Sequence, residues 1–273
     1  MRLINRRPSL GAARFLAIVP FALVLVAYLI GSGVRLAENP SDKLLPAFSS
    51  FAAAIDRMAL TPDQRTGDIL LWVDTAASLT RLGAALAISV AIGLVFGIVI
   101  GLLPYFRAGL GAFVAVISMV PPLALLPILF ITLGLGETSK IALIVIGVAP
   151  CLIRDMALRV GDMPVQQLIK AQTLGASTWQ IIIRVVLPQS LPRLIDSLRL
   201  QIGPAWLFLI AAEAIASESG LGYRIFLVRR YLAMDVILPY VAWITILAFL
   251  MDRILLIIQT RAFPWFAGAR AST

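Results

Sequence analysis

Residues 82–106 decide the fold, and they read LGAALAISVAIGLVFGIVIGLLPYF. This stretch contains no Asp, Glu, Lys or Arg. A helix that crosses a bilayer needs about 20 mostly apolar residues, because lipid offers no partners to backbone N–H and C=O groups. The stretch therefore predicts a transmembrane helix.

Five more segments are candidates for spans on either side of this stretch. Two of them also lack charged residues, 15–34 and 108–136. Three others reach spanning length only by carrying a charge at one end, namely 141–153, 200–212 and 236–251. We therefore expect an all-α integral membrane protein with about six transmembrane helices.

Composition supports the same fold class. The chain is 60% hydrophobic and 14% charged, whereas a soluble domain has about 45–50% apolar and about 25% charged residues. Its one cysteine, Cys151, cannot form an internal disulfide, and it has no histidine, the commonest metal ligand. A soluble enzyme, a disulfide-stapled domain and a zinc module are excluded, and we expect no catalytic residue and no metal site.

The charge distribution predicts the orientation in the membrane. The net charge is 23 − 14 = +9, which we assign to loops retained in the cytoplasm rather than to nucleic-acid binding. Four arginines precede the first span, Arg2, Arg6, Arg7 and Arg14. The uncharged stretch after them exceeds the ~7–15-residue core of a cleaved signal peptide, so this helix is expected to be retained. Residues 1–14 and 263–273 are then expected to be the cytoplasmic ends.

Residues 35–74 become an external loop in this orientation, and residues 75–262 form a core of five helices. Within the loop, residues 47–60 place four apolar side chains on one helical face, Phe48, Phe51, Ile55 and Met58. This pattern predicts a short helix at the membrane interface, and packing explains it better than ligand binding.

Small residues and prolines inside the spans predict how the helices pack. Gly93, Gly97 and Gly101 repeat every four residues, a spacing that lets two helix backbones approach closely. Prolines at 121, 122 and 127, and the Gly203-Pro204 pair, should bend or break their helices. The broken backbone is either simple curvature or the lining of a passage.

Glu213 is an acidic residue inside a predicted span. A charge there costs at least about 2.5 kcal/mol, so Glu213 should face protein or a cavity. It either lies on a translocation pathway or forms a structural ion pair with Arg224 or Arg229. Five residues are our candidates for the pathway: Met119, Pro121, Pro122, Trp206 and Glu213.

Residues 161–192 predict two short cytoplasmic helices joined at a sharp turn. Pro164 can open the first helix and Gly175 can end it, while Ser177 and Gln180 form a capping box that starts the second. Pro188 and Pro192 are expected to mark where the second helix ends and the next span begins. Ile181, Ile182, Val185 and Val186 can hold the second helix against the bundle.

The turn between these helices presents an apolar tip, formed by Leu174, Ala176, Thr178 and Trp179. A projecting elbow of this kind suits the groove of a partner protein. The residues alone favour a docking element only slightly over an ordinary loop.

The same segment resembles the signature loop of membrane subunits in binding-protein-dependent ABC importers. That pattern is Glu-Ala-Ala, three residues, Gly, nine residues, an aliphatic residue, any residue, and Leu-Pro. This chain matches it at Ala171, Gly175, Val185, Leu187 and Pro188. It departs from it at Ile169, where the family has Glu, and at Lys170, where it has the first Ala.

Other segments resemble the nitrate, sulfonate and taurine subfamily of these importers. They are residues 75–81, 121–124, 134–140, 211–213 and 219–223, and the resemblance covers roughly residues 44–265. Residues 170–177 and 213–234 also resemble permeases encoded beside urea- or guanidine-degrading carboxylases. The solute is left open between these classes.

The resemblance implies a type I ABC importer permease that forms the translocation pathway for a small polar solute. It implies as partners a second copy of the permease, two cytosolic ATPases and an extracytoplasmic binding protein. No cofactor is expected in this chain; ATP and Mg are expected on the ATPases, because the chain has no Gly-x-x-x-x-Gly-Lys-Ser/Thr loop. The resemblance assigns ATPase coupling to seven residues: Ala171, Leu174, Gly175, Ala176, Ser177, Thr178 and Trp179.

Two other functional classes compete with this interpretation. An ion-coupled secondary transporter would use Glu213 or Asp252 as its ion site and would contain inverted repeats, which are not evident. A membrane-embedded enzyme would need clustered nucleophiles, bases or metal ligands inside the bilayer.

Overall fold

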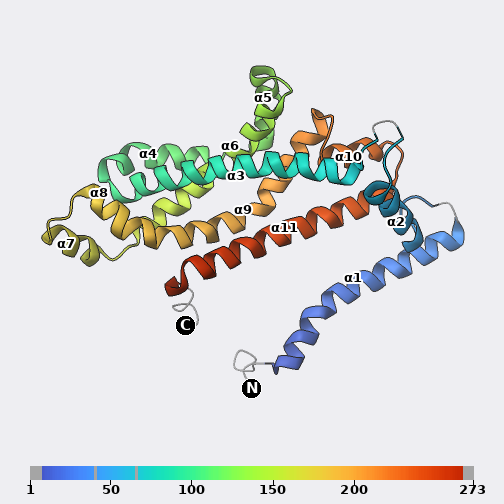
Figure 1. Ribbon diagram of the computed structural model, residues 1–273, viewed down its shortest axis with the longest axis horizontal. Coiled ribbons are helices and arrows are strands. Elements are labelled where there is room, and N and C mark those ends of the chain that lie inside the picture. The colour runs from blue at the N-terminus through green and yellow to red at the C-terminus, as the bar shows by residue number, and fades with distance from the viewer. Residues whose placement is uncertain (1–7, 40–41, 65–66, 267–273) are drawn as a thin grey trace. The chain divides into compact units, whose positions relative to one another are not determined.

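The computed structural model describes residues 8–39, 42–64 and 67–266, and within these ranges every regular element is a helix (Figure 1). Arg2, Arg6, Arg7 and the end of the tail after residue 266 lie outside the described residues. The chain divides into two compact units, residues 1–69 with 228–240, and residues 70–227 with 241–273. Each unit is described by itself.

The first unit contains the N-terminal helix α1 (Leu10–Glu38), which begins where the hydroxyl of Ser9 accepts a hydrogen bond from the N–H of Ala12. Most apolar side chains of α1 are exposed, Phe15 and Phe21 among them. In lipid such exposure is favourable, so α1 is built as a membrane span.

The predicted short helix also lies in the first unit, as α2 (Phe48–Ile55) followed by the π-helix η2 (Asp56–Leu60). The ring of Tyr28 in α1 lies 5.7 Å from that of Phe48 and 5.9 Å from that of Phe51. The Tyr28 hydroxyl donates a 2.7 Å hydrogen bond to the carbonyl of Pro46. The helix itself is confirmed, and its apolar side chains Phe48 and Phe51 pack on α1; its place at a membrane interface stays a prediction.

Long apolar helices confirm the membrane fold class. In the part of the chain that the structure describes, five helical stretches are long and apolar enough to span a bilayer: Leu10–Glu38, Leu70–Leu102 (α3), Glu137–Gly161 (α6), Thr178–Ile215 and Met234–Ala262 (α11). A sixth crossing is present if the bent pair Pro104–Ile117 (α4) and Pro122–Leu133 counts as one span. The helix α3 begins at Leu70, so Asp74, assigned above to the external loop, lies inside the helix.

The glycines of α3 allow it to contact α6 closely in the second unit. A Cβ atom placed on Gly93 would lie 2.8 Å from Cβ of Leu152, and one on Gly101 would lie 2.6 Å from Cβ of Val160. A Cβ atom on Gly97 would overlap Cβ of Met156. The predicted role of the glycine repeat in close helix packing is therefore confirmed.

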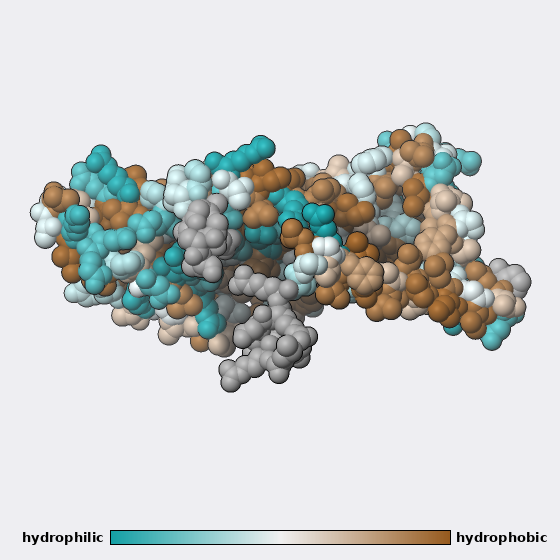
Figure 2. Space-filling model, turned by 90° about the horizontal axis from the view of Figure 1, so that it is seen from below, coloured by the Kyte–Doolittle hydropathy of each residue, from teal (hydrophilic) through white to brown (hydrophobic). Residues whose placement is uncertain are grey.

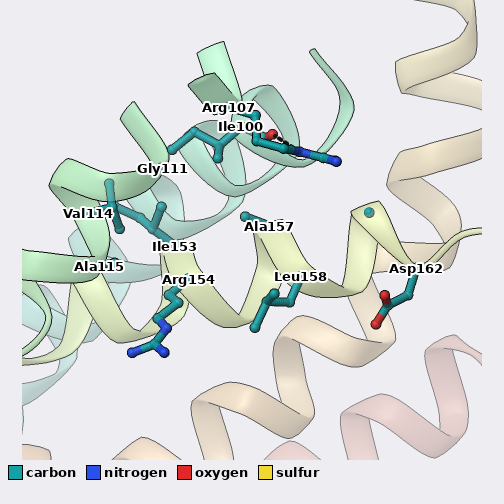
Figure 3. Close-up of a pocket in the computed structure, with 11 residues that line it drawn as sticks. Ile100, Arg107, Gly111, Val114, Ala115, Ile153, Arg154, Ala157, Leu158 and Asp162 are labelled. Atoms are coloured by element: carbon teal, nitrogen blue, oxygen red, sulfur yellow. Dashed lines mark hydrogen bonds between the residues drawn. The ribbon is translucent and has the colours of Figure 1, made fainter. Parts of the chain in front are cut away.

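The prolines break the span between residues 104 and 133. The helix α4 stops at Ile117, and a 3-10 turn η3 (Pro122–Leu125) leads into α5 (Leu126–Leu133). The stretch Pro122–Leu133 is bent by 82° from α4. At the other end of α4, Arg107 donates a hydrogen bond to the carbonyl of Ile100, in the last turn of α3 (Figure 3). It also donates to the carbonyl of Gly101 in the same turn. These bonds satisfy carbonyls that a helix end leaves without partners.

The prediction that prolines separate the second cytoplasmic helix from the next span is wrong. The elements α8 (Thr178–Ile181), η4 (Ile182–Val186) and α9 (Leu187–Ile215) run on as one helical stretch. Pro188 lies in the first turn of α9, where a missing N–H is tolerated, and the π-turn η4 precedes it. The helix also continues through Pro192 and Gly203-Pro204, so of the two expected outcomes at Gly203-Pro204, a bend or a break, the break does not occur and the bend stays a prediction.

Three side-chain contacts fasten α11, from Val241 onward, to α3 and α9. The indole N–H of Trp243 donates a 2.9 Å hydrogen bond to the Thr75 hydroxyl. The Gln259 amide donates a 2.6 Å bond to the carbonyl of Pro192. Arg199 and Asp252 form an ion pair at 2.7 Å, which gives each of these charges a partner.

Hydrophobic side chains form broad areas of the surface rather than isolated spots (Figure 2). On α11 they include Phe249, Leu250, Ile254 and Ile257, each about half exposed. An apolar surface of this extent is expected where lipid or another membrane protein replaces water.

Candidate functional site

The turn at Gly175 is built by backbone hydrogen bonds. The helix α7 (Val165–Thr173) follows Pro164, and Gly175 adopts φ +81°, a conformation that L side chains rarely take. The N–H of Gly175 donates to the carbonyl of Gln172 at 2.9 Å, and the N–H of Ala176 donates to that of Ala171 at 3.1 Å. This pair of bonds is a Schellman motif, which ends the helix in a defined direction.

The predicted capping box starts the next helix immediately after this turn. The Ser177 hydroxyl accepts a 3.3 Å hydrogen bond from the N–H of Gln180, and the Gln180 side chain accepts a 2.8 Å bond from the N–H of Ser177. Residues 164–181 therefore form an elbow whose two arms are both fixed by local hydrogen bonds.

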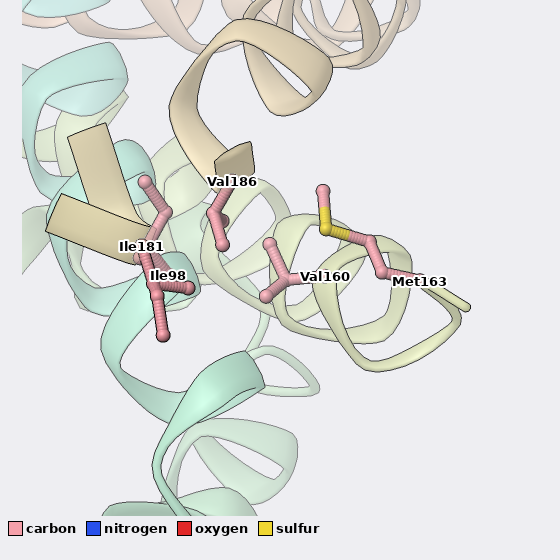
Figure 4. Close-up of a cluster of buried hydrophobic side chains, with 5 residues drawn as sticks. All are labelled: Ile98, Val160, Met163, Ile181 and Val186. Carbon is pink, nitrogen blue, oxygen red and sulfur yellow. The ribbon is translucent and has the colours of Figure 1, made fainter. Parts of the chain in front are cut away.

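A buried hydrophobic cluster anchors the elbow to the rest of the second unit (Figure 4). Its members come from α3, the end of α6 and the stretch α8–η4, and they are Ile98, Val160, Met163, Ile181 and Val186. Ala171 and Ala176 pack against the cluster, as do Ile182 and Val185. The predicted anchoring by residues 181–186 is confirmed, whereas Ala176, expected at the exposed tip, is partly buried because its backbone closes the turn.

The tip of the elbow points its apolar side chains outward. Leu174 is 79% exposed and Trp179 is 67% exposed, and Gly175, Ser177 and Thr178 are exposed beside them. Ile169, at the position of the family's Glu, is also exposed. Exposed apolar side chains that gather on one turn are typical of a protein contact.

Apart from the elbow, a polar cluster surrounds Glu213, which is fully buried. Arg81 donates to it at 2.7 Å and Ser78 at 2.8 Å, and the N–H of Gly222 donates to its other oxygen at 2.8 Å. Arg81 also pairs with Glu137, whose second partner is Lys140 at 2.9 Å. The cluster joins α3, α6, α9 and the start of α10 (Leu221–Arg229).

This geometry supports the prediction that Glu213 forms a structural ion pair. Its partner is Arg81, whereas Arg224 or Arg229 was predicted. Arg224 donates instead to Asp74, at 2.8 Å. Asp74, Ser78 and Arg81 are spaced by four and three residues and so lie on one face of α3. From this spacing a buried polar face of the helix could have been predicted, but the sequence analysis above did not predict it. Among the described residues, no three His, Cys, Asp or Glu side chains are grouped so as to hold a metal.

A family model covers most of this architecture. Residues 89–266 match the family described as the binding-protein-dependent transport system inner membrane component. The chain belongs to this family. It is a transmembrane permease subunit of a binding-protein-dependent ABC importer and lies in the inner membrane as a multi-pass protein.

Named relatives agree with the family. Over 201 residues this permease is 42% identical to the taurine transport system permease protein TauC of Escherichia coli K12, which covers 72% of each chain. It is 30% identical over 211 residues to the bicarbonate transport system permease protein CmpB of Synechococcus elongatus, which covers 72% of this chain and 76% of the relative.

A solved structure supports the fold. One chain of a crystal structure of the MetNI methionine ABC transporter, in an inward-facing conformation, superposes with a TM-score of 0.53 at 19% identity. The match covers 69% of this permease and 97% of the other chain. The all-helical type I permease fold expected from the resemblance is confirmed.

The five pathway candidates of this permease lie in two settings. Met119, 71% exposed, and the pair Pro121 and Pro122 lie at the break between α4 and α5. Trp206 and Glu213 are buried on α9. The Trp206 indole N–H has no hydrogen-bond partner among the described residues. Their assignment to a pathway stays a prediction.

Replacing Gly175 with Ala is expected to loosen the elbow. A Cβ atom there meets nothing within 4 Å, so the effect comes only from the left-handed backbone, which costs about 1–2 kcal/mol. Amide hydrogen exchange at Ala176 and Gln180 should become about 5- to 30-fold faster. Gly175→Asn is the control, since Asn tolerates this conformation. Equal exchange rates in both variants would contradict the role given to φ.

Proposed function

We propose that residues 164–181 are the coupling element of this permease and dock on a cytosolic ATPase subunit. The observation that carries the proposal is the pairing of a rigid turn with exposed Leu174 and Trp179 at its tip. Docking needs both properties. A flexible tip would have to be ordered on binding, and the entropy cost would reduce the affinity. A polar tip would bury little apolar surface in the contact.

The continuous helix from α8 to α9 supports a mechanism for coupling. A displacement of the elbow is carried along one helical stretch, Thr178–Ile215, to Trp206 and Glu213. ATP-driven closure of two ATPases moves the elbows, and the cavity between the permease subunits changes from inward-open to outward-open. Moving such an equilibrium from 1:99 to 99:1 takes about 5.5 kcal/mol of differential binding, so the docking contact has to be tight.

The assembly that we propose contains two copies of this permease, two ATPases that bind ATP and Mg, and an extracytoplasmic binding protein. The permease itself hydrolyses no ATP. Both termini and the elbow lie in the cytoplasm, as Arg14, Arg154 and Arg159 favour on the basis of the positive-inside rule.

The proposed solute is a small polar molecule or ion that carries a negatively charged group, such as a sulfonate or nitrate. This class is supported by the relative named for taurine transport at 42% identity and by relatives named for nitrate and bicarbonate. A urea- or guanidine-like solute has only the sequence resemblance in its favour.

The test places a charge at the tip of the elbow. Leu174→Asp removes an apolar anchor and should weaken ATPase binding by about thirtyfold, the effect of a 2 kcal/mol hot spot. We expect loss of the ATPase from the affinity-purified permease and loss of solute uptake. Leu174 is a better probe than Ala176, because Ala176 packs against the buried cluster.

Leu10→Asp is the matched control for this experiment. Leu10 is 82% exposed, begins α1 and lies on the same predicted side of the membrane. This variant should retain the ATPase and uptake, and both variants should insert equally into the membrane. Normal ATPase recovery with Leu174→Asp would refute the docking of the elbow.

A further inference from the structure

The side of α7 that faces away from the buried cluster carries Ile169 and Lys170. Leu168 and Ala171 pack against the cluster, and successive residues of a helix are rotated by about 100°. Ile169 and Lys170 therefore lie on the opposite side of α7, and both are exposed. Since neither residue holds the elbow in place, both are available to contact a partner.

Exposed apolar side chains continue from α7 around the turn to α8. Val165 and Ile169 lie four residues apart on α7, Leu174 lies at the tip, and Trp179 lies in the first turn of α8. Each of these four residues is more than half exposed. A contact that buries them requires an apolar surface on the partner.

Positive charge accompanies these apolar side chains. Residues 163–195 contain Lys170, Arg184 and Arg193 and no Asp or Glu. Lys170 and Arg184 are exposed, and neither forms an ion pair with any residue that the structure describes. The nearest acidic residue in the sequence, Asp162, caps the end of α6 and precedes the elbow. Within the elbow itself, residue 170 carries the only charge, and that charge is positive.

We propose that the ATPase surface that receives the elbow is an apolar groove with a carboxylate at its rim, opposite Lys170. The proposal rests on the proposed function, which docks the elbow on a cytosolic ATPase. A carboxylate across the contact attracts the elbow and excludes ATPases with a basic rim. The elbow has Ile169 where the family pattern has Glu, so it presents no negative charge that would repel this carboxylate.

The test measures the affinity of the ATPase for the permease as the charge at position 170 changes. The ATPase that co-purifies with the wild-type protein is bound to the full-length permease in phosphatidylcholine nanodiscs, which contain no anionic lipid to pair with Lys170. At low salt, about 50 mM, Lys170→Gln removes one attraction and should weaken binding about threefold. Lys170→Glu adds an equal repulsion and should weaken binding about tenfold. At about 0.5 M salt both differences should fall below about twofold, because salt screens an exposed pair.

A second pair of variants tests the same carboxylate from the neighbouring residue. Ile169→Gln removes an apolar contact, and Ile169→Glu removes the same contact and adds a negative charge. At low salt Ile169→Glu should therefore bind about threefold more weakly than Ile169→Gln. Arg261→Glu is the matched control for the charge reversal, because Arg261 is exposed in the last turn of α11, on the same predicted side of the membrane and outside the elbow. Its affinity should stay within about twofold of the wild-type value.

Two results would overturn the proposal and leave the proposed function intact. One is equal affinity of Lys170→Glu and Lys170→Gln at low salt, which would show that no carboxylate faces this position. The other is stronger binding by Ile169→Glu than by Ile169→Gln, which would place a basic residue on the ATPase. In both cases Leu174→Asp would still lose the ATPase, because that variant tests docking itself. Normal ATPase binding by Leu174→Asp would refute the docking of the elbow and this proposal with it.

Discussion

Replacing Arg81 with Gln is expected to destabilise the folded permease by about 3–5 kcal/mol, because Glu213 is fully buried and would lose its cationic partner. Glu137 would be less affected, since its side chain is 56% exposed and Lys140 still pairs with it. The measurement is the midpoint of SDS-induced unfolding in mixed micelles, followed by circular dichroism.

The double variant Arg81→Gln with Glu213→Gln is the decisive comparison. It removes both charges while its amides can still hydrogen-bond to Ser78 and Gly222, so about half of the lost stability or more should return. Arg159→Gln, in a pair with Asp155 whose side chains are 32% and 37% exposed, should change stability by at most about 1 kcal/mol. A double variant no more stable than Arg81→Gln alone would show that the charge of Glu213 is not the cause.

Gly97→Ala should have the next largest effect on stability, about 1–3 kcal/mol. The new Cβ atom overlaps Cβ of Met156, and neither atom can rotate away because both are fixed to their backbones. The helices α3 and α6 have to separate, which also loosens the neighbouring contacts of Gly93 and Gly101. The same SDS titration measures the change.

Gly83→Ala is the control on the same helix. A Cβ atom at Gly83 meets nothing within 4 Å, and Ala is the better helix former by about 0.5–1 kcal/mol. Gly83→Ala should therefore leave stability unchanged or raise it slightly. If both variants behaved alike, close packing at Gly97 would not explain its effect.

Features set by neighbouring residues were predictable from the sequence. The break at Pro121 and Pro122 follows from the missing N–H of proline, and the turn at Gly175 follows from the conformational freedom of glycine. The capping box of Ser177 and Gln180 involves residues three apart, so its geometry is local. The close packing of α3 was also predictable, because the glycine spacing indicates a face that contacts another helix. That this other helix is α6 was not predictable from the spacing.

Features that depend on distant residues were not predictable in the same way. Arg81 and Glu213 are far apart in sequence, and the same residues allow several pairings until the helices are placed. Both carboxylates proposed for an ion-coupled carrier, Glu213 and Asp252, have arginine partners at 2.7 Å, and nothing supports that alternative. The continuity of α8 with α9 was missed because the π-turn η4 precedes Pro188 and lets the helical stretch run on through this proline.

The π-turn at Ile182–Val186 sets the direction in which the elbow projects from the axis of α9. One surplus residue in a turn advances a helix by about 100° beyond its ordinary phase. Deleting a single residue from 182–186 would therefore swing Leu174 and Trp179 around the axis of α9 while leaving every side chain of the tip unaltered. In this permease, chain length over five positions is as much a determinant of what the tip can reach as the identity of the amino acids that form it.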